Sequence, residues 1–68
     1  MNKDIAQGKW AQLKGSIKQT WGNLTDSDIA QVNGDAQKMC GLLQETYGIS
    51  QEVAQREVDD FWSRHNHP

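Results

Sequence analysis

The hydrophobic residues in the first third of the chain recur at helical spacing. They stand three or four positions apart, which places them on one face of a helix. The members of this stripe are Ala6, Trp10, Leu13, Ile17, Trp21 and Leu24. The spacing predicts a helix over residues 4–22, with a single apolar face that packs against the rest of the chain.

Polar residues and glycines mark the limits of this first helix. Asn2 or Asp4 is placed to cap its start, and Gly22 is placed to end it in a left-handed conformation. Gly8 and Gly15 fall away from the stripe, and each weakens an isolated helix by about 1 kcal/mol relative to alanine. We therefore expect these two glycines to permit the close approach of another backbone.

A second helix is predicted over residues 26–32. Thr25 precedes it as an N-cap, and aspartates in its first turn complement the helix dipole. Leu24, just before the cap, is placed to pack against Ile29 as a hydrophobic staple.

The next segment supports two interpretations. Asn33-Gly34 indicates a break, and Asp35 is a cap for a new helix over residues 35–47, which Gly48 would end. The hydrophobic residues nevertheless keep helical spacing through Gly34, which would suit one long bent helix. They are Ile29, Val32, Ala36, Met39, Leu43 and Tyr47. We prefer a short helix followed by a longer one.

Ser50 predicts the start of a fourth helix over residues 51–64. Its inner face consists of Ala54, Val58, Phe61 and Trp62. No segment alternates with period two, so no sheet is expected. The prediction is an all-α domain of four short helices spanning residues 1–68, with residues 66–68 frayed.

The chain is short and hydrophilic. Its 68 residues suit one domain, and 35% of them are hydrophobic, with a mean hydropathy of -0.85. Three tryptophans, one tyrosine and one phenylalanine partly compensate, since each buried aromatic removes about 150–250 Å² from water. We expect a thin core anchored by aromatic rings.

Charge is unevenly distributed about a net value of -2. Residues 1–24 hold four lysines against one aspartate, and residues 25–68 hold three basic residues against eight acidic ones. Such a chain could attract itself within one fold or dimerise head to tail, so we expect a monomer or weak self-association. It is poorly suited to tight binding of duplex nucleic acid, which needs concentrated cationic contacts.

The composition favours a cytoplasmic protein. The polar start does not resemble a secretory signal peptide, and no window approaches the roughly 18 apolar residues of a spanning helix. The single cysteine, Cys40, has no partner for an internal disulfide.

Candidate chemistry is sparse, and no metal, cofactor or catalytic residue is predicted. His65 and His67 are remote in sequence from Cys40, whereas a metal site needs three or four converging ligands. Cys40 lies on or near an apolar face, where a thiol behaves as a small hydrophobe. Asp59 and Asp60 point about 100° apart on a helix, so they cannot share a substrate.

One candidate interaction surface lies on the first helix. Trp10, Lys14, Lys18 and Trp21 follow spacings of four, four and three. Aromatic and cationic groups so interleaved could receive a nucleic-acid strand, an anionic headgroup or an acidic protein. The alternative, which we favour, places both rings in the core with the lysine stems over them.

Several of these residues occur in runs that resemble the CsbD-like family. The runs are Lys3-Asp4, Gly8-Lys9-Trp10, Leu13-Lys14-Gly15-Ser16-Ile17-Lys18 and Trp21-Gly22-Asn23-Leu24-Thr25-Asp26-Ser27-Asp28. The likeness continues through Gly34, Gly41, Gln44, Tyr47-Gly48 and the acidic fourth helix ending in Trp62. It covers nearly the whole chain.

The resemblance implies a small bacterial cytosolic protein, abundant under general stress, in a family without an assigned biochemical activity. It also implies a compact array of short helices similar to the sterile-alpha-motif type of fold. It supplies no catalytic residues. Cys40 and Leu42 depart from the family pattern, in which lysine often follows the glycine at position 41. They make the third helix more apolar and favour a contact surface there.

Overall fold

The computed structural model describes residues 7–65, and this part of the chain is built from helices and turns without a strand. The helices follow one another as α1 (Gln7–Thr20), α2 (Asp26–Val32), α3 (Ala36–Tyr47) and α4 (Gln51–His65). The predicted all-α class and four-helix array are confirmed. The caps proposed at Asn2 or Asp4, the place of Ala6 on the stripe and the fraying of 66–68 lie outside the described residues.

Three of the helices begin at the predicted caps. The side-chain oxygens of Thr25, Asp35 and Ser50 each accept hydrogen bonds from backbone N–H groups two or three residues later, at 2.9–3.2 Å. Each cap therefore satisfies donors that the first turn of a helix leaves without a partner. Leu24 and Ile29, the expected staple around the Thr25 cap, are both buried in the core.

α2 and α3 are separate helices, as preferred from the sequence. Asn33 has φ 50° and ψ 42°, and Gly34 has φ 82°, so two successive residues are left-handed. Asparagine and glycine are the residues that adopt this conformation most readily. The N–H of Asp35 donates to the carbonyl of Val32 at 3.0 Å and closes the turn.

The expected ending of α1 is wrong. Gly22 is not among the residues of positive φ in the described chain, which are Asn33, Gly34 and Gly48. The N–H of Trp21 instead donates to the Ile17 carbonyl at 2.8 Å, and the N–H of Leu24 donates to the Trp21 carbonyl at 3.1 Å. A hydrogen-bonded turn over 21–24 therefore ends the helix without a left-handed residue.

The expected role of Gly15 within the chain is also wrong. A Cβ atom at this position would meet no other heavy atom within 4 Å. Gly15 is exposed on α1, and no other backbone among the described residues lies against it. Side-chain surroundings of Gly8 lie outside the described part.

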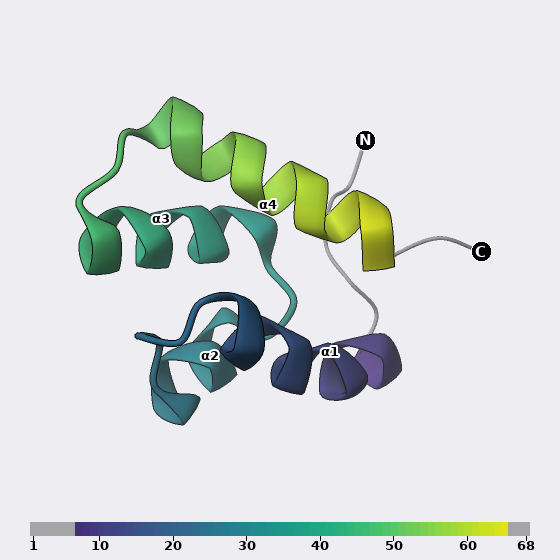
Figure 1. Cartoon of the computed structure of the whole chain (residues 1–68). Helices are drawn as coiled ribbons and strands as arrows, with labels where there is room; N and C mark the ends of the chain where they lie inside the picture. Colours follow the sequence, from purple (N-terminus) through teal and green to yellow (C-terminus); the bar gives the residue numbers. More distant parts are fainter. Residues whose placement is uncertain (1–6, 66–68) are drawn as a thin grey trace.

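The core lies between two pairs of helices. α3 and α4 pack along each other, and α1 and α2 lie together on the opposite side (Figure 1). Within the described part of the chain, thirteen buried hydrophobic residues fill the space between the pairs. They are Trp10, Leu13, Ile17, Trp21, Leu24, Ile29, Val32, Met39, Leu43, Ala54, Val58, Phe61 and Trp62. The predicted inner face of α4 is confirmed in full.

Aromatic rings link α1 and the turn that follows it to α4. The Trp10 and Trp62 ring centroids lie 6.4 Å apart, and those of Trp21 and Phe61 lie 5.1 Å apart. Phe61 also contacts Trp62, with centroids 5.7 Å apart. Tyr47 does not join this cluster: it is 38% exposed, although its position continues the hydrophobic spacing of α3. The radius of gyration, 10.9 Å, equals the roughly 11 Å expected for a folded chain of this length.

Candidate interaction surfaces

The four residues of the predicted surface on α1 divide between the core and the exterior. Trp10 and Trp21 are only 4% and 7% exposed, and their rings pack on Trp62 and Phe61 respectively. The Nε1–H of Trp21 donates to an Oε atom of Glu57 at 3.1 Å. The tryptophan faces are therefore covered by the chain itself, and no base or other planar ligand can stack on them in this conformation.

The two lysines of the predicted surface are exposed. Lys14 and Lys18 are one helical turn apart, so both project from the same side of α1. The ammonium group of Lys18 donates to the Leu24 carbonyl at 2.5 Å, across the turn that follows the helix. Lys18 thus ties the turn after α1 to the helix as well as contributing charge.

We use "outer face of α1" for the exposed residues Ala11, Lys14, Gly15 and Lys18. They follow the spacing of three, one and three that groups residues on one side of a helix. The helix sequence contains three lysines and no acidic residue, so the charge that α1 itself contributes to this face is positive. Its two small residues keep its profile low between the lysines.

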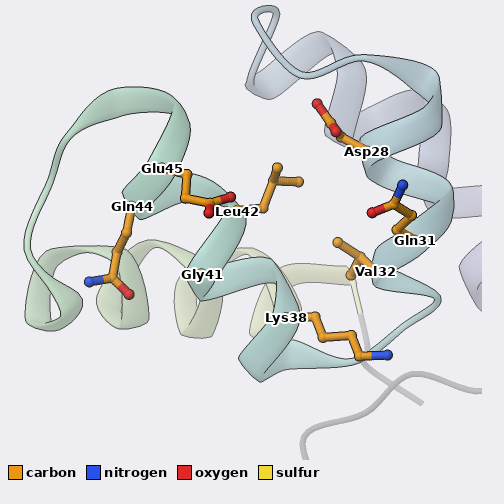
Figure 2. Close-up of a pocket in the computed structure, with 8 residues that line it drawn as sticks. All are labelled: Asp28, Gln31, Val32, Lys38, Gly41, Leu42, Gln44 and Glu45. Atoms are coloured by element: carbon orange, nitrogen blue, oxygen red, sulfur yellow. The ribbon is translucent and has the colours of Figure 1, made fainter.

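A groove of about 770 Å³ lies between α2 and α3 (Figure 2). Its lining combines an apolar floor with a polar rim. The lining residues are Asp28, Gln31, Val32, Lys38, Gly41, Leu42, Gln44 and Glu45. This groove, called the α2–α3 groove below, is open to solvent and suits a protruding surface better than an enclosed small molecule.

Charge is arranged unevenly around the α2–α3 groove. Asp28 from α2 and Glu45 from α3 lie on the two sides of Leu42, whereas Lys38 lies at the opposite end (Figure 2). The end that holds Leu42 is therefore acidic around a half-buried hydrophobic side chain. The expectation of a contact surface on the third helix points to the same residue, Leu42.

Sequence reasoning did not find the acidic end of this groove. The sequence explains Asp28 as an acidic residue that complements the dipole of α2, and the residues around Glu45 do not indicate a binding role for it. Their proximity depends on the left-handed turn at Asn33-Gly34, which folds α3 back along α2. The turn itself was predicted, but the angle between the two helices cannot be read from the residues that form it.

A smaller hollow of about 400 Å³ lies where α1, α3 and α4 meet. It is lined by Thr20, Trp21, Tyr47, Glu57, Asp60 and Arg64. The Tyr47 hydroxyl accepts a hydrogen bond from the N–H of Asn23 at 3.4 Å. This contact and the bond from Trp21 to Glu57 tie the turn after α1 to the other helices. The hollow therefore has a structural role in the described chain.

Cys40 and His65, the described residues with the most reactive side chains, both pack against other side chains. Cys40 is half-buried and packs against the core. Burial raises the pKa of the Cys40 thiol, and the negative charge of Asp59 raises it further. The thiolate is the reactive form, so Cys40 is a weak nucleophile at neutral pH. His65 stacks on Phe61, with ring centroids 4.2 Å apart.

The described residues form neither a cluster of metal ligands nor a helix able to span a membrane. Within residues 7–65, no three side chains of histidine, cysteine, aspartate or glutamate gather as ligands for a metal ion. No helix in the same range has the length and apolar character needed to cross a bilayer. His67, the second histidine of the sequence, lies outside this range.

Comparison with known proteins identifies the family. The family model described as CsbD-like matches residues 4–56. A UPF0337 protein of Bordetella pertussis is 50% identical over 64 residues, which cover 94% of this chain and 97% of the relative. A UPF0337 protein of Pseudomonas aeruginosa is 52% identical over 64 residues, covering 94% and 98%. The UPF0337 protein YjbJ of Escherichia coli is 43% identical over 67 residues, covering 98% and 97%. With most of its length matched by the model and by such relatives, the chain belongs to the CsbD-like family.

Proposed function

We propose that this chain is a non-enzymatic bacterial stress-response protein that works in the cytoplasm through binding or through its abundance. The observation that supports the proposal most directly is that the large aromatic side chains are buried in the core. The three tryptophans and Phe61 are at most 7% exposed and pack on one another. The rings best suited to recognition or to shaping a reactive site are committed to holding four short helices together. Membership of the CsbD-like family supports the link with general stress.

The stress role is tested by the amount of protein. In the source bacterium, quantitative mass spectrometry before and after osmotic shift and entry into stationary phase should show a several-fold rise. A level that stays flat under both conditions would contradict the proposal.

A chemical role for the Cys40 thiol is tested separately. A strain lacking the chromosomal copy should be complemented as well by Cys40→Ala as by the unaltered protein, because the thiol is proposed to have no chemical role. Equal protein levels in the two complemented strains are the control. Failure of Cys40→Ala at an equal level would argue for a reactive cysteine.

A second candidate function is binding of a polyanion through α1. The observation that favours it is the exposure of Lys14 and Lys18 on a helix that has no acidic residue. Since the rings of Trp10 and Trp21 are buried, such binding would rest on charge alone. It would be weak, non-specific in sequence and strongly dependent on salt.

Fluorescence anisotropy with a single-stranded oligonucleotide tests this candidate. Two to three lysine contacts predict a slope of about -1.4 to -2.1 for the logarithm of affinity against the logarithm of salt concentration. The double variant Lys14→Glu/Lys18→Glu should abolish binding, and Lys38→Glu/Arg56→Glu, with the same change in net charge, should reduce it far less. Equal loss in both variants would show that only total charge matters, and unchanged binding in the first would exclude α1.

A further inference from the structure

The outer face of α1 is a convex helix surface suited to docking, and it is called the ridge below. Ala11 and Gly15 give the helix a low profile, and Lys14 and Lys18 stand beside them as exposed cations. The two lysines are separated by about 6 Å along the helix axis, so a partner with two nearby carboxylates could meet both. This face lies beside the buried residues of α1, and its four members are exposed.

The α2–α3 groove has the complementary chemistry. Its acidic end presents Asp28 and Glu45 on either side of the half-buried Leu42, and Lys38 is at the far end (Figure 2). A cationic ridge would be attracted to the first end and repelled from the second, so the charges specify a position along the groove. None of the residues that line the groove comes from α1, so one copy can offer both surfaces at once.

Two helix-interior glycines lie on these two surfaces, Gly15 on the ridge and Gly41 in the lining of the groove. A Cβ atom at either position would meet nothing within 4 Å in the same chain. Packing within one molecule therefore does not require glycine at either place, although glycine weakens a helix. Contact between two helices brings their backbones closer where side chains are missing, which accounts for both glycines together.

We propose that the outer face of α1 of one copy docks into the α2–α3 groove of a second copy. The ridge and the groove are different surfaces, so the contact is heterologous and leaves a free ridge and a free groove at the two ends. The product is a head-to-tail series of copies, in which Lys14 and Lys18 lie at the Asp28 and Glu45 end. This inference rests on the proposed function in one respect: both assign an anionic partner to Lys14 and Lys18.

Sedimentation of the full chain tests the assembly directly. At about 0.1 M salt and concentrations up to millimolar, the weight-average mass should rise above the 7.7 kDa of one copy and pass that of a dimer. At about 1 M salt, where screening acts within about 3 Å, the mass should fall toward one copy. A protein that stays monomeric at low salt, or a mass that levels off at a dimer, would overturn the proposal.

Charge reversals locate the contact. Lys14→Glu and Glu45→Lys should each weaken association about tenfold or more, because each sets like charges against one another. An equimolar mixture of the two variants should associate again, since one retains an intact groove and the other an intact ridge. Arg56→Glu and Glu52→Lys, which make the same changes of charge outside both surfaces, should leave association as it was. Loss in these controls, or no recovery in the mixture, would refute the assignment.

Two further variants separate docking from loss of folding. Lys38→Glu removes the repulsive end of the groove and should tighten association about threefold or more, which an unfolded chain cannot do. Gly15→Gln adds bulk to the ridge without changing charge and should weaken association about tenfold, while its far-ultraviolet circular dichroism matches the parent. Unchanged association in both variants would count against the proposed contact.

The same variants distinguish this inference from polyanion binding by α1. Glu45→Lys should impair self-association and leave oligonucleotide binding intact, whereas Lys14→Glu should impair both. If the parent protein is monomeric but binds the oligonucleotide, the self-association fails and the second candidate function stands.

Discussion

Replacement of Gly15 by alanine should stabilise the fold. Gly15 lies inside α1, its φ is not positive, and an added Cβ would meet no heavy atom within 4 Å. The substitution therefore introduces no clash and removes the conformational freedom that glycine has in the unfolded chain. The same substitution at Gly48 is a matched contrast, because Gly48 ends α3 with φ 66°.

The two variants should differ in sign. Gly15→Ala should raise the free energy of unfolding by about 1 kcal/mol, the difference between the helix propensities of alanine and glycine. Gly48→Ala should lower it by about 1 kcal/mol, since a left-handed conformation places Cβ too near a carbonyl oxygen. For a chain of this size, about 1 kcal/mol corresponds to about 4–8 °C in Tm.

Urea unfolding followed by far-ultraviolet circular dichroism measures both effects. The experiment belongs at micromolar protein concentration, so that any self-association does not add to stability. The slope of free energy against urea should stay constant, which ties a change of midpoint to stability. A Gly15→Ala variant less stable than the parent would refute the assignment of open space around Gly15. A neutral Gly48→Ala variant would refute the left-handed end of α3.

Three other predictions concern the caps, the thiol and the indoles. Thr25→Ala should lower the free energy of unfolding by about 1 kcal/mol in the same urea assay, and Thr25→Ser, which keeps the oxygen, should restore most of it. Cys40 should be alkylated by iodoacetamide more slowly than a free cysteine peptide at neutral pH, because its pKa is raised. The free energy of unfolding should fall as pH rises from the ordinary pKa of a thiol through the raised pKa of Cys40 in the folded chain. The Cys40→Ala variant should lack this pH-dependent component. Iodide should quench the fluorescence of the native tryptophans, which are at most 7% exposed, much less than that of the urea-unfolded chain; equal quenching would contradict their burial.

Local chemistry predicted the elements of this fold well. Thr25, Asp35 and Ser50 are caps because their side-chain oxygens reach backbone groups a few residues away, a relation that is contained within a short stretch of sequence. The break at Asn33-Gly34 is equally local, since both residue types tolerate the left-handed region.

The errors arose where the outcome depends on distant neighbours or on competing hydrogen bonds. Gly22 follows a helix as a left-handed glycine would, yet the bond from the Leu24 N–H to the Trp21 carbonyl closes a turn that does not need one. The pattern predicts that Gly15 permits the approach of another backbone, but within the described residues of one copy it has open space beside it, which only the three-dimensional arrangement reveals.

The same distinction between local pattern and long-range arrangement applies to the candidate surfaces. The exposure of Lys14 and Lys18 follows from the periodicity of α1, whereas the acidic end of the α2–α3 groove brings together Asp28 and Glu45, seventeen positions apart. The partner of the Trp21 indole, Glu57, is still more distant in sequence. Such pairs require the relative placement of whole helices, which no local pattern contains.

Each described helix packs mainly on a neighbour along the chain, and the rings of Trp10 and Trp62 join α1 to α4. Chains dominated by neighbouring contacts have a low contact order and fold in about microseconds to milliseconds. Copies unfolded by heat or solute shock would therefore regain their shape almost as soon as the insult passes, with little time to aggregate or to require chaperones.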